Sequence, residues 1–237
     1  MKTLTDALRS ADHVFLDFDG PVCSVFAGLR APTVAARLRD VLAEVLGYPL
    51  PDDWAKEDDP LALLRRVDDT RPELTAVTDS ALADLELDAV ALAEATEGGE
   101  STIHACQASG RAVWIVSNNA SVAIHAYLSR RGLTDAVAGV FGRVPAEPAL
   151  MKPHPRLLHD AMHAAAADPA SCIFVGDAAR DVLAGEAAGV DTIGYANKPG
   201  KKDVLQDAGA VAVVESMKAI ADALFPPGVP HGPPEAE

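Results

Sequence analysis

Two aspartates, Asp17 and Asp19, directly follow the apolar run His13–Leu16 and precede Gly20. Carboxylates are rarely buried without a partner, so two of them at the end of a buried strand are costly for packing alone. Their types and spacing favour chemistry in which one carboxylate is a nucleophile or metal ligand and the other transfers protons. Taken alone, the pair could also form a turn, because aspartate is a common turn residue.

Further polar residues follow later apolar segments of the chain. They are Ser117 and Asn118, then Lys152, then Asp177 and Asp181. Taken singly, each has an ordinary explanation, because serine often caps a helix and a lysine or an aspartate is usually exposed. In an open parallel sheet, however, ligands bind at the edge where the carboxyl ends of the strands meet. We therefore expect these residues to gather with Asp17 and Asp19, with Lys152 at the start of a helix.

Six short apolar segments predict the strands of a parallel sheet. Rich in Val, Ile and Phe, they show little alternation, which is typical of strands covered on both faces. The segments are Val14–Phe18, Ala112–Val116, Ala136–Phe141, Cys172–Val175, Thr192–Tyr195 and Val211–Val214. Helical patterns that end at Gly110, Gly132 and Gly189 precede three of these strands. This order predicts an α/β fold with a doubly wound parallel sheet, a Rossmannoid core.

Residues 21–100 interrupt the alternation of strands and helices, and they contain no convincing strand. Helical patterns cover Val34–Leu46, Leu61–Val67 and Pro72–Glu97. We therefore predict a small helical cap domain at 21–100, inserted into a catalytic core made of residues 1–20 and 101–225. Residues 226–237 are rich in proline and are expected to form a disordered tail.

The composition disfavours several classes of partner. The chain has 237 residues, 49% of them hydrophobic, which is enough for a sizeable core. Its net charge of −15 disfavours nucleic acid and anionic membrane surfaces. Three cysteines without a Cys-x-x-Cys motif indicate neither a disulfide framework nor structural zinc, and they fit a reducing cytoplasm. No apolar stretch is long enough to span a bilayer. The oligomeric state stays open.

Together the motifs resemble those of the haloacid dehalogenase superfamily, and in particular its phosphoglycolate-phosphatase-like members. Their order in this chain is Asp-x-Asp-Gly, Ser-Asn, Lys-Pro and Gly-Asp-x-x-x-Asp. The resemblance extends from Asp17 to Asp181 and so covers most of the expected globular part. One subclass of that superfamily also carries a mobile cap after the first motif, where residues 21–100 are inserted here.

The resemblance implies a Mg²⁺-dependent phosphatase that hydrolyses a small phosphorylated metabolite through an aspartyl-phosphate intermediate. Asp17 would be the nucleophile and Asp19 the general acid and base. Ser117 and the backbone N–H of Asn118 would bind phosphate oxygens near a helix N-terminus. Lys152 would neutralise both the nucleophile and the phosphoryl group.

The resemblance also implies a metal site. Asp17, the backbone carbonyl of Asp19 and Asp177 would bind Mg²⁺, which prefers hard oxygen ligands. Asp181 lies one helical turn beyond Asp177 and would hold a metal-bound water. Several carboxylates facing a phosphate would repel it strongly, so a divalent cation together with Lys152 is needed to make such a site workable.

Four alternatives remain open to different degrees. A phosphomutase of the β-phosphoglucomutase type would return the phosphoryl group to another hydroxyl. A phosphonatase would need a cap lysine as a Schiff base, and the insertion offers only Lys56, which has acidic neighbours that favour its protonated form. A haloalkanoate dehalogenase needs neither Asp19 nor Mg²⁺. A non-enzymatic phospho-acceptor would have no use for a built-in acid and base.

Two departures from the family pattern leave the substrate open. Pro21 stands in the loop after the first motif, and Ala178 replaces the usual hydroxyl residue after Asp177. Neither change removes a catalytic group. Substrate choice is set by cap residues, among which Arg30 and Arg65 could reach a second anionic group of a substrate.

Overall fold

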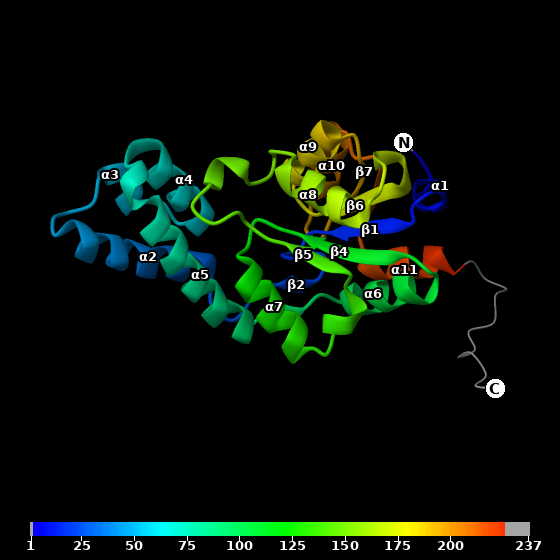
Figure 1. Ribbon diagram of the computed structural model, residues 1–237, viewed down its shortest axis with the longest axis horizontal. Coiled ribbons are helices and arrows are strands. Elements are labelled where there is room, and N and C mark those ends of the chain that lie inside the picture. The colour runs from blue at the N-terminus through cyan, green and yellow to red at the C-terminus, as the bar shows by residue number, and fades with distance from the viewer. Residues whose placement is uncertain (1, 226–237) are drawn as a thin grey trace.

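The computed structural model describes residues 2–225 and contains one parallel sheet of six strands, in the order β5-β4-β1-β6-β7-β8. The strands are β1 (His13–Leu16), β4 (Ala112–Val116), β5 (Gly139–Phe141), β6 (Cys172–Gly176), β7 (Asp191–Tyr195) and β8 (Ala212–Val214). Helices cover both faces (Figure 1). The predicted α/β fold with a doubly wound parallel sheet is confirmed.

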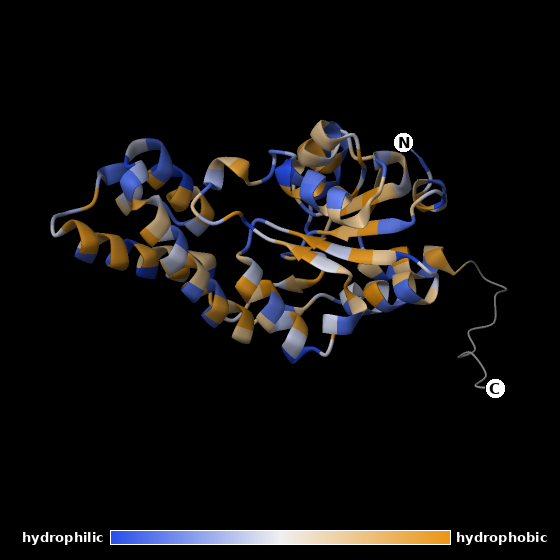
Figure 2. Ribbon diagram, in the orientation of Figure 1, coloured by the Kyte–Doolittle hydropathy of each residue, from blue (hydrophilic) through white to orange (hydrophobic). Residues whose placement is uncertain are grey.

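The central strand β1 pairs with β4 on one side and β6 on the other, so that Phe15 aligns with Trp114 and with Phe174. Val14 and Leu16 belong to the apolar cluster on one face of the sheet, and Phe15 belongs to the cluster on the other face. Both faces of β1 are therefore covered, which explains why its sequence shows no alternation. Figure 2 shows hydrophobic residues along the strands.

Two groups of helices cover these faces. One face carries α1 (Leu4–Leu8), α6 (Gly99–Ala108), α7 (Ser121–Arg130) and α11 (Met217–Leu224); the other carries α8 (Arg156–Ala165), α9 (Ala179–Ala188) and α10 (Lys201–Asp207). The sheet-edge strand β5 begins at Gly139 rather than at Ala136, and Ala136 belongs to the 3-10 turn Thr134–Ala136.

The insertion forms α2 (Ala31–Leu46), α3 (Asp52–Ala55), α4 (Pro60–Thr70) and α5 (Thr75–Ala91), gathered at one end of the molecule (Figure 1). The expectation that it contains no strand is wrong. Strand β2 (Cys23–Ser24) pairs in antiparallel fashion with β3 (Glu94–Ala95), so the two ends of the insertion lie side by side. A ladder of two residues per strand is too short to produce an apolar run that sequence could reveal.

The buried apolar side chains of the insertion continue without a break into those beneath the sheet. The division into a core and a cap domain at residues 21–100 stays a prediction, and the tail at 226–237 lies outside the described residues. Among residues 2–225, no helix has the length and apolar character needed to cross a membrane. Cys23, Cys106 and Cys172 are buried and free.

Because the apolar cluster is continuous, we expect the insertion and the sheet to unfold together. Replacing the fully buried Leu64 by alanine should lower the free energy of unfolding by about 2–5 kcal/mol in a single transition. Chemical denaturation followed by tryptophan fluorescence measures the free energy of unfolding, because Trp54 reports on the insertion and Trp114 on the sheet. Leu92→Ala is the matched control, since Leu92 is 56% exposed. Two separate transitions would contradict a shared core.

Candidate active site

The carboxyl ends of the central strands open onto a cavity of about 230 Å³. Its lining includes Asp17, Asp19, Ser117, Asn118, Lys152 and Asp177. The insertion closes the other side of the cavity with Phe26, Ala31 and Leu61. Six of the seven residues singled out from the sequence therefore meet at one cavity, and the seventh, Asp181, is fully buried behind it.

Lys152 is buried between two carboxylates. Its Nζ lies 2.9 Å from Asp17 Oδ1 and 2.7 Å from Asp181 Oδ1. It also donates to the carbonyl of Val116 at 3.1 Å and lies 5.2 Å from the centre of the Phe174 ring. The ammonium group thus has partners after β1, at the end of β4, within β6 and in α9, which fix its position without help from a ligand.

Burial and charge act against each other in this cluster. Burial raises the pKa of Asp17 to about 7, and the carboxylates of Asp181 and Asp177 add to this effect while Lys152 opposes it. Burial lowers the pKa of Lys152, but the two carboxylates that it touches outweigh burial and hold that pKa above its ordinary value. The site therefore contains a permanent ammonium and an excess of carboxylates that favours a further cation.

Asp19 is positioned by the first residues of the insertion. Its Oδ1 accepts a hydrogen bond from the backbone N–H of Val25 at 2.9 Å. Burial raises the pKa of Asp19, the hydrogen bond from Val25 lowers it, and the charge of Asp177 raises it again, with a net rise. A raised pKa suits a carboxyl group that must hold and release a proton near neutral pH.

Gly20 makes the sharp turn after Asp19 possible. Its φ is +111°, a conformation that side chains disfavour, and a Cβ there would lie 2.6 Å from Cγ of Asp177. At the end of β6, a Cβ on Gly176 would lie 2.3 Å from Cβ of Asp181. Both glycines are required by the close approach of the aspartates rather than by the turns alone.

Asn118 binds the peptide of Lys152. Its side chain accepts from the Lys152 N–H at 2.8 Å and donates to the Lys152 carbonyl at 3.2 Å. Lys152 is not at the start of a helix as expected, because α8 begins at Arg156. The Asn118 side chain supplies the backbone contacts that a helix would have provided. Ser117, next to it, lies at the start of the loop that leads into α7.

Asp17, Asp177 and Asp181 each offer a carboxylate oxygen within 4.8 Å of the other two. Such a set of hard oxygen donors fits Mg²⁺. The two oxygens of Asp181 are already engaged, one by Lys152 and the other by the backbone N–H of Ala178 at 3.0 Å. Direct ligation would therefore fall to Asp17 and Asp177. The side chain of Asp19 is not in the cluster.

The structure also brings in residues that sequence reasoning missed. Asp177 Oδ2 accepts from Asn197 Nδ2 at 2.9 Å and forms an ion pair with Lys201. Both partners follow β7 at the same edge of the sheet, so the rule that strand ends converge could have found them. Arg180 lines the cavity as well. Arg65, by contrast, is not among the residues that line this cavity, and its guanidinium group donates to the Lys152 carbonyl at 3.2 Å.

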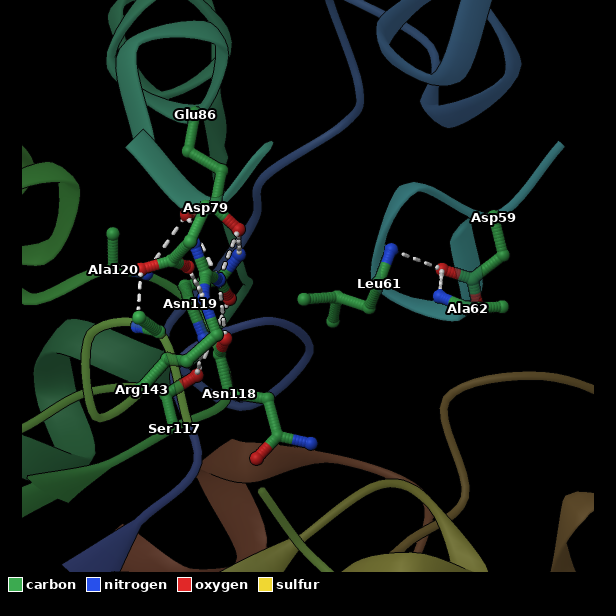
Figure 3. Close-up of polar contacts among 11 residues, drawn as sticks. Asp59, Leu61, Ala62, Asp79, Glu86, Ser117, Asn118, Asn119, Ala120 and Arg143 are labelled. Atoms are coloured by element: carbon green, nitrogen blue, oxygen red, sulfur yellow. Dashed lines mark hydrogen bonds and ion pairs between the residues drawn. The ribbon is translucent and has the colours of Figure 1, made fainter. Parts of the chain in front are cut away.

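A buried group of charges lies behind Ser117 and Asn118 (Figure 3). Glu86 and Asp79 of α5 contact Arg143, which follows β5, and all three are buried. The sequence offered no sign of this group, because the two acidic residues lie in a helix that also carries exposed acidic residues.

The model of the haloacid dehalogenase-like hydrolase family matches residues 11–189, from the strand before Asp17 to the end of the helix that carries Asp181. This chain belongs to that family of hydrolases. The resemblance drawn from the four motifs is thereby confirmed. No curated protein sequence matches the chain.

Solved structures of similar fold include other haloacid dehalogenase-like proteins. A family hydrolase from Streptococcus pneumoniae has 13% identity and a TM-score of 0.64, covering 90% of this chain and 97% of its own. CbbY from Rhodobacter sphaeroides, in complex with phosphate, has 15% identity and a TM-score of 0.66 over 90% and 99%. A protein named as a predicted phosphoglycolate phosphatase from Haemophilus somnus has 16% identity and a TM-score of 0.61 over 89% and 96%.

The raised pKa of Asp17 has a consequence for the stability of this hydrolase without metal. Folded Asp17 keeps its proton up to a pH of about 7, against 3.8 for the free side chain. The folded state then binds more protons than the unfolded state between these values, so the free energy of unfolding falls as the pH rises through them. In EDTA, Asp17→Asn should be more stable than wild type at pH 7, with a difference that narrows toward pH 4.

Chemical denaturation at a series of pH values measures this difference. Asp12→Asn, which changes an exposed carboxylate just before β1, is the control and should follow the wild-type curve. A wild-type stability that rises between pH 4 and pH 7 as steeply as that of Asp17→Asn would contradict the assignment.

Proposed function

We propose that the protein is a Mg²⁺-dependent phosphatase that hydrolyses a small phosphorylated metabolite through an aspartyl-phosphate on Asp17. The observation that carries the proposal is the presence of two carboxylates with different surroundings at one cavity. Asp17 contacts the ammonium of Lys152, whereas Asp19 is held by the backbone N–H of Val25. A nucleophile benefits from an ammonium in direct contact, and an acid benefits when its carboxyl group is held by a neutral donor instead, because its pKa then stays raised.

In the first step, an oxygen of Asp17 attacks phosphorus and the bond from phosphorus to the ester oxygen breaks. Asp19 donates its proton to that oxygen, which leaves as an alcohol. In the second step, Asp19 accepts a proton from water as the water attacks the aspartyl-phosphate, and inorganic phosphate is released. Asp17 and Asp19 return to their starting protonation states, so the cycle balances.

Three groups are placed to bind the phosphoryl oxygens. Lys152 contributes a fixed positive charge, and Ser117 and the backbone N–H of Asn118 lie at the start of the loop before α7. Because the Asn118 side chain is committed to the peptide of Lys152, movement of one of these groups is transmitted to the other. The phosphate-binding groups therefore form one preorganised unit.

Asp17 and Asp177 are the residues that would hold Mg²⁺, with the backbone carbonyl of Asp19 as a further oxygen donor and Asp181 acting through water. When bound, the metal would offset the negative charge of the carboxylates and of the phosphoryl group. Lys201 occupies an oxygen of Asp177 in this structure. Lys201 itself lines the cavity, so it adds a positive charge beside the residues that would hold the cation.

The cavity suits a small substrate. On the insertion side its wall combines the apolar side chains of Phe26 and Leu61 with the charged group of Asp59, and Arg180 of α9 also lines the cavity. A net charge of −15 argues against nucleic acid as the phosphorylated partner. Helix α3 lies among the insertion helices (Figure 1), and Lys56, which ends it, has its ammonium group 3.6 Å from the carboxylate of Asp52. This arrangement gives no support to a phosphonatase that uses Lys56.

We expect Asp17→Asn to abolish hydrolysis of p-nitrophenyl phosphate, because the amide is no nucleophile. Asp19→Asn should instead allow one turnover with this activated substrate and then accumulate phosphorylated protein, since water activation is lost. Mass spectrometry of acid-quenched protein detects the added phosphoryl group. Turnover by Asp17→Asn at the wild-type rate would exclude the mechanism.

Removal of divalent cations should silence the enzyme. EDTA is expected to abolish phosphate release, and added Mg²⁺ to restore it. Asp177→Asn should weaken the response to Mg²⁺, whereas Asp207→Asn, a change at the end of α10, should leave it unchanged. Phosphate release at a series of Mg²⁺ concentrations measures both effects. Full activity in EDTA would contradict the assignment of Asp17 and Asp177.

A further inference from the structure

Glu86 of the insertion helix α5 is fully buried against the loop that follows β4. One oxygen of its carboxylate accepts from the side-chain amide of Asn119 at 3.0 Å, and the other accepts from the backbone N–H of Ala120 at 2.8 Å. Ala120 is the residue that caps α7. A side chain of the insertion therefore binds the N-terminus of the helix that follows the proposed phosphate-binding residues (Figure 3).

Arg143 balances the charge of Glu86 and binds the same loop. Its Nη1 lies 3.2 Å from Glu86 and donates to the carbonyl of Asn118 at 2.8 Å, while its Nε contacts Asp79. Its backbone N–H donates to the carbonyl of Asn119 at 2.9 Å. Burial lowers the pKa of Arg143, but the two carboxylates outweigh burial and raise that pKa above its ordinary value.

Glu86 determines how the Asn119 side chain is turned. A carboxylate only accepts hydrogen bonds, so the amide nitrogen of Asn119 must face Glu86 and its oxygen must face the other way. That oxygen lies 3.2 Å from the hydroxyl oxygen of Ser117 and accepts from it, and the Asn119 N–H donates back to Ser117 at 3.3 Å. The position of the Ser117 hydroxyl thus depends on Glu86 through one intervening side chain.

Stability alone is a weak explanation for this arrangement. Burying an ion pair costs desolvation that its attraction only partly repays, and an apolar pair of similar volume is often as stable. Within the described residues, the other side-chain hydrogen bonds of Glu86 and Arg143 go to residues 118–120 or to Asp79. Asp79 also accepts from the N–H of Ala146 at 3.0 Å, whereas Glu86 and Arg143 both bind the loop that carries Ser117 and Asn118.

We propose that Glu86 is a positioning residue for phosphate binding: from the insertion, it orients Asn119 and thereby the Ser117 hydroxyl, with Arg143 as its counter-charge. This inference rests on the proposed function of the site. Helix α5 then takes part in binding the phosphoryl group without touching it. The insertion thus supplies both a wall of the cavity and a residue that orients the phosphate-binding loop.

Glu86→Gln tests the proposal, because it keeps the shape but replaces one of the two acceptor oxygens by a donor. Binding of inorganic phosphate in the presence of Mg²⁺, measured by calorimetry, should weaken about tenfold, the size expected for losing a hydrogen bond to a charged group. KM for p-nitrophenyl phosphate should rise more than kcat falls. The Mg²⁺ concentration for half-maximal activity should stay unchanged, since Asp17 and Asp177 follow β1 and β6, whereas Glu86 binds the loop after β4.

Asp84→Asn is the matched control. Asp84 is exposed on the same helix, two positions away, and the same change from carboxylate to amide should leave phosphate binding and KM as in wild type. If the effect of Glu86→Gln came only from a general destabilisation of α5, Asp84→Asn would weaken phosphate binding as well, and that result would contradict the proposal.

Asn119→Ala keeps the proposal testable if Glu86→Gln folds poorly, because it removes the link to Ser117 and leaves the ion pair of Glu86 with Arg143 intact. It should weaken phosphate binding by a similar factor, and the double variant should bind no more weakly than the worse single variant. Additive losses, or wild-type phosphate affinity in both single variants, would overturn the inference while leaving the phosphatase assignment standing. A wild-type protein that neither binds phosphate nor hydrolyses esters would overturn both.

Discussion

The ammonium group of Lys152, buried between Asp17 and Asp181, is the interaction on which the rest of the site depends. Neither carboxylate could stay charged at this depth without it. Yet Asp177 brings a third carboxylate to the same place, so the cluster holds more negative than positive charge, which would oppose the proposed anionic substrate. A divalent cation would offset this charge, and Lys201, which pairs with Asp177, already offsets part of it.

The order of strands explains why these residues meet. Strand β1 lies between β4 and β6, so the residues that follow these three strands share one edge of the sheet. This much could be predicted from sequence, because buried strands appear as apolar runs and the polar residues after them stand out. Asp17, Ser117 and Asp177 were found in this way. The glycines at 20 and 176 carry the same information, since each leaves room for an aspartate.

Other parts of the structure leave no such trace in the sequence. Glu86 lies in a helix between Asp84 and Asp88, both exposed, and nothing local distinguishes the one carboxylate that is buried. Its partner Arg143 is far along the chain, and only tertiary packing brings the two together. The pairing of β2 with β3 is equally invisible, because two residues per strand cannot form a pattern. Asn197 and Lys201, by contrast, follow β7 and obey the rule that located the other site residues.

The contacts of α5 also bear on which part of the insertion can move. Besides the ion pairs of Glu86 and Asp79 with Arg143, Arg130 of α7 donates to the carbonyls of Val90 and Ala91 at 2.6 and 2.8 Å. Displacing α5 from α7 would expose or unpair buried charges, at a cost of several kcal/mol. Helix α5 is therefore bound energetically to the sheet, although the sequence places it in the insertion. Helix α4 has a similar tie, because Arg65 donates to the Lys152 carbonyl at 3.2 Å, so the wall that Ala31 and Leu61 give the cavity is held against the core from two helices.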